Sequence, residues 1–175
     1  MIELLIWRHA KSVHRKAGMN DRERGLRPVG REDARAIGAM LAERRLVPDI
    51  ILCSDADRTR ETVETARPLL GSNPEQYDTR DLYGADARDY PGIISVYGGT
   101  ARRILLVGHN PAVSDFVSRA AGRSVHMKTA SLAVIEADAA SPEELTSATD
   151  FSLRDVLVPP RRANPRANPR ANPRG

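Results

Sequence analysis

Short apolar runs alternate with polar and amphipathic stretches along this chain. The first run, from Ile2 to Trp7, is interrupted only by Glu3 and is rich in large or β-branched side chains, which is typical of a buried strand. The apolar runs at residues 50–53 and 104–107 are equally clear, and the three other runs are weaker. The predicted strands cover residues 2–7, 50–53, 76–79, 104–107, 131–135 and 151–158, the last as an edge strand.

Helical periodicity fills most of the intervals between these strands. In residues 30–46, Ala34, Ile37 and Leu41 recur at spacings of three and four, so they share one face. The predicted helices cover residues 30–46, 55–70, 91–97 and 111–121. Residues 11–28 are too charged and broken to be core and are predicted as a polar loop. Strands that alternate with helices favour an α/β fold, in which helices cover both faces of a mostly parallel sheet.

The chain changes character at residue 159. A length of 175 residues favours a single domain, which we place at residues 1–158. In residues 159–175 the sequence Ala-Asn-Pro-Arg occurs three times, and a proline at every fourth position excludes helix and sheet ladders. We therefore predict a disordered basic tail. It is either a solvated appendage or an electrostatic anchor for an acidic partner or nucleic acid.

The positive net charge of the chain comes from the tail, and residues 1–158 are nearly neutral. Five of the 27 basic side chains lie in residues 159–175, which leaves 22 basic against 23 acidic residues in residues 1–158. The high pI therefore gives no reason to expect nucleic-acid binding by the domain itself. Cys53 is the only cysteine, which excludes an internal disulfide or a thiolate metal cluster. The start lacks a secretory pattern and no apolar run reaches the ~18 residues of a membrane span, so we expect a cytoplasmic protein without a membrane partner.

Cationic and imidazole side chains stand where three predicted strands end. Arg8 and His9 follow the first strand, His109 follows the strand 104–107, and Arg58 comes shortly after the strand that ends at Cys53. The carboxyl ends of parallel strands share one edge of a sheet, and ligands bind there in α/β folds. The topology therefore predicts that these four side chains lie together.

Two guanidinium groups beside a helix N-terminus favour a dianion, and phosphate is the common one. Two imidazoles supply a nucleophile and a second group that stabilises charge or moves a proton. A lone histidine is usually structural, but independent structural histidines need not share one edge of a sheet. His14 and His126 lack such placement and are predicted to be surface residues.

Cys53 also lies at a strand end, so a cysteine phosphatase is an alternative. In those enzymes an arginine six positions after the cysteine closes the loop around the phosphate. Position 59 is threonine here, and the arginines stand at 58 and 60. Cys53 is therefore predicted to be the buried last residue of a strand.

Four segments in this order resemble the histidine phosphatase superfamily, which includes the phosphoglycerate mutases. They are Arg8-His9-Ala10-Lys11-Ser12, residues 26–31, residues 53–62 and residues 107–111. The compact length and the first motif are similar to the SixA-type phosphohistidine phosphatase branch, and the match covers residues 1–136.

This resemblance implies a three-layer α/β/α sandwich. It also implies that His9 is the nucleophile that becomes phosphorylated, and that Arg8, Arg58 and His109 hold the phosphoryl group. Ser12 of the first motif is expected to contact the substrate as well. His9 must attack through a neutral nitrogen, so we expect the two arginines to lower its pKa and a backbone carbonyl to accept its other ring N–H.

Larger members of the family carry a carboxylate that protonates the leaving oxygen, before an aromatic-Gly pair. At the matching distance from Tyr83-Gly84 stands Arg80, and Asp81 is one position away, so a general acid is in doubt. A phosphorylated imidazole can take its proton from solvent and needs no such acid. The short chain also leaves little room for a cap over the site, which suits a protein substrate.

Three functions stay open at this point. The first is a phosphatase for phosphohistidine in a protein, and the second is the same chemistry on a small phosphate ester such as a nucleotide or sugar phosphate. The third is a catalytically idle phosphate-binding module. No metal or other cofactor is expected, because the arginines supply the positive charge.

Overall fold

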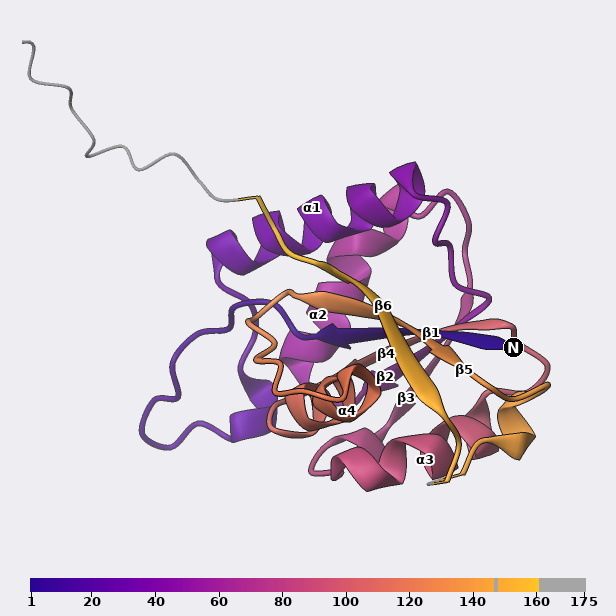
Figure 1. Ribbon diagram of the computed structural model, residues 1–175. Helices are drawn as coiled ribbons and strands as arrows, with labels where there is room; N and C mark the ends of the chain where they lie inside the picture. Colours follow the sequence, from indigo (N-terminus) through magenta and orange to yellow (C-terminus); the bar gives the residue numbers. More distant parts are fainter. Residues whose placement is uncertain (147, 161–175) are drawn as a thin grey trace, which may run out of the picture.

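A six-stranded sheet forms the centre of the computed structural model, which describes residues 1–146 and 148–160. The strands are β1 (Ile2–Arg8), β2 (Ile50–Ser54), β3 (Glu75–Thr79), β4 (Arg103–Gly108), β5 (Leu132–Ala137) and β6 (Phe151–Leu157). Their order across the sheet is β3-β2-β4-β1-β5-β6 (Figure 1). The strands β3, β2, β4 and β1 run parallel, whereas β5 is antiparallel to both of its neighbours. The prediction of an α/β fold with a mostly parallel sheet is confirmed.

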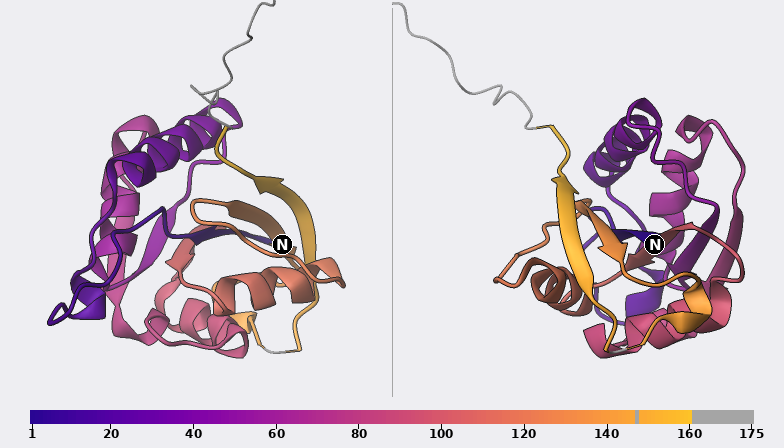
Figure 2. Two further views of the ribbon diagram at one scale, coloured as in Figure 1. Left: turned by 90° about the vertical axis from the view of Figure 1, so that its left-hand side faces the viewer. Right: turned by 45° about the vertical axis from the view of Figure 1, so that its right-hand side comes forward.

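Helices cover both faces of the sheet (Figures 1 and 2). On one face lie α1 (Pro28–Glu43) and α2 (Asp57–Ala66), and on the other lie α3 (Tyr90–Tyr97) and α4 (Ala112–Ala121). Short 3-10 turns complete the described elements: η1 (Asp21–Glu23), η2 (Arg67–Leu69), η3 (Arg80–Leu82), η4 (Ala87–Asp89) and η5 (Pro142–Glu144).

All four predicted helices differ from the observed ones at their ends, α3 and α4 by one residue and α1 and α2 by more. The helix predicted over residues 30–46 begins at Pro28, because proline is favoured in a first turn, and it ends at Glu43. The helix predicted over residues 55–70 begins at Asp57, and its last turn tightens into η2 after Ala66.

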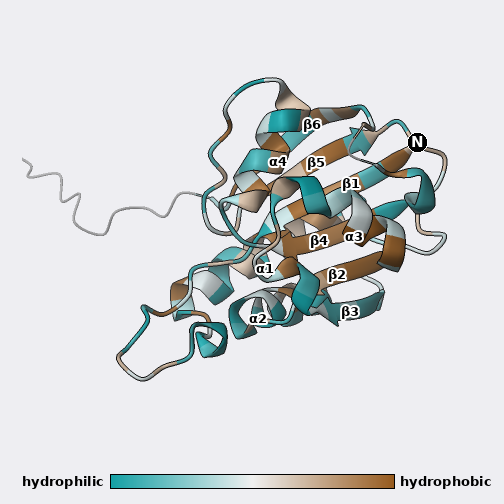
Figure 3. Ribbon diagram, turned by 90° about the horizontal axis from the view of Figure 1, so that it is seen from below, coloured by the Kyte–Doolittle hydropathy of each residue, from teal (hydrophilic) through white to brown (hydrophobic). Residues whose placement is uncertain are grey.

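Strand β1 divides the core into two halves. Successive side chains of a strand point to opposite faces. Ile2, Leu4 and Ile6 are buried among the side chains of α3 and α4, while Leu5 and Trp7 are buried among those of α1 and α2. The middle segments of the central strands are therefore mostly apolar (Figure 3), as expected for strands that are buried on both faces.

The parallel register brings three strand ends to one rim of the sheet. Arg8 lies opposite Gly108 in the β1–β4 pair, and Cys53 lies opposite Val107 in the β2–β4 pair. We call this edge the His9 rim: it consists of the last residues of β1, β2 and β4 and of the loops and first helical turns that follow these strands.

The predicted tail reaches beyond the described part of the chain. Pro159 and Pro160 follow β6 outside any helix or strand, and residues 161–175 lie outside the described residues. Among the residues that the structure covers, none of the helices has the length and apolar character needed to cross a bilayer. The domain boundary at residue 158 and a cytoplasmic location stay predictions.

Gly30 allows α1 to approach the loop that follows β1. A Cβ at this position would lie 2.3 Å from the carbonyl oxygen of Lys11 and 2.9 Å from its amide nitrogen, two residues beyond His9. Because backbone atoms must move to relieve this contact, Gly30→Ala is expected to lower the free energy of unfolding by about 1–3 kcal/mol. Urea denaturation measures the loss.

The control is Gly92→Ala in α3, where an added Cβ has no atom within 4 Å. Removing a glycine from a helix should leave stability unchanged or raise it by up to about 1 kcal/mol. Equal stabilities of the two variants would contradict the close approach at Gly30.

Candidate active site

His9 is the first residue after β1 and is buried, with 8% of its surface exposed. Its Nδ1 donates a hydrogen bond of 2.8 Å to the carbonyl oxygen of Ala10. Since a carbonyl only accepts, the proton of the neutral ring lies on Nδ1, and Nε2 keeps a free electron pair. The predicted bond to a backbone carbonyl is therefore present.

The backbone after His9 is tied to α2. The amide of Ala10 donates to Oγ1 of Thr62 at 3.0 Å, and the same hydroxyl donates to the carbonyl of Arg58 at 2.6 Å. One hydroxyl thus links the loop that carries His9 to the first turn of the helix that carries Arg58.

His109 follows β4 and faces His9 across the His9 rim. The centroids of the two rings are 5.1 Å apart, with 55° between the ring planes. Nε2 of His109 lies 2.8 Å from Oγ of Ser54, the last residue of β2. When the Ser54 hydroxyl donates this bond, the proton of His109 lies on Nδ1.

Both imidazoles are held neutral. The pKa of His9 is lowered to about 4, mainly by burial, which the charges of Arg58 and Arg8 assist and the hydrogen bond to Ala10 opposes. Burial also lowers the pKa of His109 to about 3, assisted by His9 and Arg58. The arginines act in the predicted direction, but burial is the larger cause.

The two predicted arginines are anchored by one end of the guanidinium. Arg58, in the first turn of α2, is 5% exposed. It donates from Nη1 to the backbone carbonyl of Asp21 at 2.7 Å and from Nη2 to the Asp21 carboxylate at 3.0 Å. Arg8 donates from Nη1 to the carbonyl of Met127 at 2.7 Å. In both arginines Nε is buried.

Unpaired donors gather around His9. Within residues 1–146 and 148–160, five buried side-chain nitrogen or oxygen atoms lack a hydrogen-bond partner. They are Nε of Arg8, Nε of Arg58, Nδ1 of His109, Oδ1 of Asp55 and the hydroxyl of Tyr90. A buried donor left unpaired costs about 1–3 kcal/mol. The first three belong to the predicted site. The two Nε groups are donors, and Nδ1 of His109 is a third donor when the Ser54 hydroxyl donates to Nε2, so together they suit an anion.

Asp21, Arg24 and Tyr83 also belong to this site, and sequence reasoning missed them. Asp21 accepts from Nε of Arg24 at 2.9 Å and from the Tyr83 hydroxyl at 2.9 Å, in addition to its two bonds from Arg58. The ring of Tyr83 meets His109 edge-on, with centroids 5.5 Å apart. Asp21 and Arg24 lie in the predicted polar loop, where no periodicity shows which charges turn inward.

Ser12 contacts Arg24 in this structure. Its hydroxyl oxygen accepts from Nη1 of Arg24 at 3.1 Å, and the same nitrogen donates to the carbonyl of Val13 at 2.9 Å. The hydroxyl keeps its own O–H as a donor. Contact between Ser12 and a substrate stays a prediction.

Cys53 and Asp81, the alternative nucleophile and the possible general acid, lie outside this site. Cys53 is fully buried, and burial raises the pKa of its thiol well above the ordinary value, which opposes thiolate formation. Asp81 is exposed and accepts a hydrogen bond of 2.9 Å from Tyr97, and Arg80 is exposed beside it. His14 and His126 are exposed, as predicted for surface residues.

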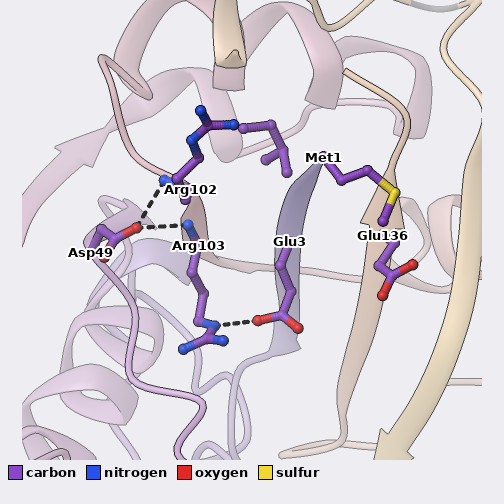
Figure 4. A pocket seen from close by; sticks show the side chains of 7 residues that line it. Met1, Glu3, Asp49, Arg102, Arg103 and Glu136 are labelled. Atoms are coloured by element: carbon purple, nitrogen blue, oxygen red, sulfur yellow. Dashed lines mark hydrogen bonds and ion pairs between the residues drawn. The ribbon is translucent and has the colours of Figure 1, made fainter. Parts of the chain in front are cut away.

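A cavity of about 360 Å³ lies at the opposite edge, where β1 and β4 begin (Figure 4). The charged side chains that line it are bound within the protein. Asp49 accepts from the backbone amides of Arg102 and Arg103, and the Arg103 side chain pairs with Glu3. The lining Glu136 pairs with Arg154. None of these charged side chains in the described chain carries an unpaired buried atom, unlike those at the His9 rim. The His9 rim is therefore the candidate site.

Comparison with known proteins identifies a family and similar folds. The model of the Histidine phosphatase superfamily (branch 1) matches residues 4–82. An uncharacterized chloroplastic protein of Arabidopsis thaliana is 31% identical over 168 residues, covering 89% of this chain and 77% of the relative. An uncharacterized protein of Mycobacterium tuberculosis is 36% identical over 107 residues, covering 61% of this chain and 65% of the relative.

Solved structures share the fold over most of the chain. A candidate phosphohistidine phosphatase SixA from Agrobacterium tumefaciens has a TM-score of 0.76 and 26% identity, covering 91% of this chain and 99% of that one. The protein histidine phosphatase SixA complexed with tungstate also has a TM-score of 0.76, at 17% identity and with 90% and 97% covered. The second likeness is one of fold alone.

The neutral histidines predict a loss of stability in mild acid. His9 stays neutral in the folded state down to a pKa of about 4, whereas in the unfolded chain it takes up a proton near pH 6.5. The unfolded state therefore binds more protons between these values, so the free energy of unfolding falls as the pH falls through this window. Replacing His9 by asparagine should remove about 2 kcal/mol of the fall between pH 7 and pH 5.

Urea denaturation of the wild type and of His9→Asn at pH 7, 6 and 5 measures this difference. A pH dependence that is the same in both proteins would contradict the burial of a neutral imidazole at position 9.

Proposed function

The chain belongs to the histidine phosphatase superfamily (branch 1), and on that basis we propose that it is a phosphatase that removes phosphate from phosphohistidine in a protein, through a covalent intermediate on His9. Arg8, Arg58 and His109 hold the transferred phosphoryl group in this proposal.

One observation supports this chemistry above the others. His9 is a neutral, buried imidazole whose Nδ1–H is bound to the Ala10 carbonyl, beside buried donors of Arg8, Arg58 and His109 that lack partners within the described residues. A nucleophile with a free electron pair thus stands next to groups that stabilise negative charge on the oxygens around phosphorus.

The reaction has two displacements. In the first, Nε2 of His9 forms a bond to phosphorus while the bond from phosphorus to the leaving imidazole breaks, and that imidazole takes a proton from solvent. The positive charge that develops on His9 is shared with the Ala10 carbonyl through Nδ1–H. In the second, a water oxygen bonds to phosphorus and the bond to Nε2 breaks. The water releases one proton to solvent and keeps the other, and the products are inorganic phosphate and free, neutral His9.

The environment of Asp21 favours a leaving group that needs no protein acid. Burial raises the pKa of this carboxyl, but the hydrogen bond from Tyr83 and the charges of Arg58 and Arg24 outweigh burial and hold the pKa below its usual range. Asp21 is therefore ionised at neutral pH and has no proton to give. Asp81, the other candidate acid, is exposed and bound by Tyr97.

The similar SixA structure from Agrobacterium tumefaciens, at 26% identity, supports a phosphohistidine substrate by analogy. A small phosphate ester is the second candidate, since the same displacement acts on any phosphoryl group. An alkoxide leaving group requires a proton that neither carboxylate is placed to supply.

His9→Ala tests the nucleophile. We expect hydrolysis of a histidine-phosphorylated protein to fall by about a thousandfold or more, because a covalent step cannot proceed without its nucleophile. Acid-labile phosphate should be trapped on the wild type during turnover and be missing from the variant. His126→Ala, which replaces an exposed histidine outside the site, is the control and should keep wild-type activity. Trapped phosphate on His9→Ala would refute the assignment.

Leaving groups of different basicity test the substrate class. The wild type should hydrolyse a phosphohistidine protein fastest, p-nitrophenyl phosphate more slowly and a sugar phosphate slowest, because only the last leaves as a basic alkoxide. The measurement is kcat/KM for each substrate. A sugar phosphate that reacts faster than phosphohistidine would favour the small-ester alternative.

A further inference from the structure

We propose that Asp21 is the built-in counter-anion of the phosphate site, which positions Arg58 and weakens its hold on phosphate so that the product leaves. This inference rests on the proposed function, because it concerns how the same site releases inorganic phosphate. It assigns a positioning residue, since Asp21 acts through Arg58.

The contacts of Asp21 divide the Arg58 guanidinium into two edges. A guanidinium has five N–H donors in a fixed plane. The backbone carbonyl of Asp21 accepts from Nη1 at 2.7 Å, and its carboxylate accepts from Nη2 at 3.0 Å, so Asp21 occupies the end of the fork. The side edge, which carries Nε–H and the second N–H of Nη2, stays available, and Nε is buried. An oxyanion can bind this edge while Asp21 holds the other.

Asp21 is itself fixed from two further directions. One carboxylate oxygen accepts from Nε of Arg24, and the other accepts from the Tyr83 hydroxyl as well as from Arg58. Arg24 is in turn bound to Ser12 and Val13. The carboxylate therefore cannot swing toward a bound phosphate without breaking bonds to three side chains.

The negative charge of Asp21 is expected to affect the affinity of the site for phosphate. Arg8, Arg58 and Arg24 all act on His9 as positive charges, and Asp21 is the carboxylate in direct contact with two of them. The negative charge of this carboxylate repels a phosphate dianion that is bound at the His9 rim. Neighbouring charges near a protein surface interact strongly enough to change an affinity by about tenfold.

The Asp21→Asn variant tests the effect of the carboxylate charge at nearly unchanged side-chain shape. Asparagine is nearly the same size and keeps one acceptor oxygen for Arg58 or Tyr83, but it lacks the negative charge. We expect this variant to bind inorganic phosphate about tenfold more tightly than the wild type, with a matching fall in the inhibition constant of phosphate and a lower kcat at unchanged or lower KM. Isothermal titration calorimetry with inorganic phosphate at pH 7 measures the affinity without any turnover.

Asp81→Asn is the matched control. Asp81 accepts from a tyrosine hydroxyl at 2.9 Å, as Asp21 does, but it is exposed and contacts Tyr97 instead of the site. The Asp81→Asn variant should bind inorganic phosphate with the same affinity as the wild type. If Asp21→Asn does not fold, Asp21→Ser removes the same charge with a smaller acceptor, and the same tightening is expected.

Phosphate affinity that is equal or weaker in a folded Asp21→Asn or Asp21→Ser variant would overturn the proposal, because loss of the carboxylate would then have removed only positioning. Failure of the proposed function is a separate result: it would appear as a lack of phosphohistidine hydrolysis by the wild type, and the phosphate titrations would still decide the role of Asp21.

Discussion

The parallel pairing of β1 with β4, and of β4 with β2, is the constraint on which the candidate site depends. It sets Arg8 opposite Gly108, so the residues that follow the two strands, His9 and His109, leave the sheet side by side. The apolar side chains on both faces of β1 fix this register. A slip by one residue would turn Leu4 and Leu5 toward the wrong halves of the core.

The two like charges of Arg8 and Arg58 lie at the His9 rim, and each guanidinium is held by an acceptor at one end. Arg8 is anchored on the carbonyl of Met127, and Arg58 is anchored on Asp21. Burial keeps the imidazoles of His9 and His109 uncharged, so they add no further repulsion. The remaining N–H groups are arranged before any substrate arrives, which is the condition under which fixed dipoles stabilise a developing charge well.

Much of this arrangement could be predicted from the sequence, and the reason is local. Arg8, His9 and His109 are adjacent to apolar strands, and Arg58 lies one turn into a helix, so topology alone brings them together. The loop of residues 11–28 gave no such signal. Its Asp and Arg residues have no period, and only the path of the backbone through η1 decides that Asp21 and Arg24 face the site. The role of Tyr83 cannot be predicted from the sequence, because an aromatic side chain does not reveal which carboxylate its hydroxyl will reach.

The hydroxyl of Thr62 has an effect on motion. It accepts from the amide of Ala10 and donates to the carbonyl of Arg58, so the peptide after His9 and the first turn of α2 share one clamp. A displacement of α2 would therefore strain the peptide that follows the nucleophile. The clamp couples the position of the attacking nitrogen to that of the cation that stabilises its target.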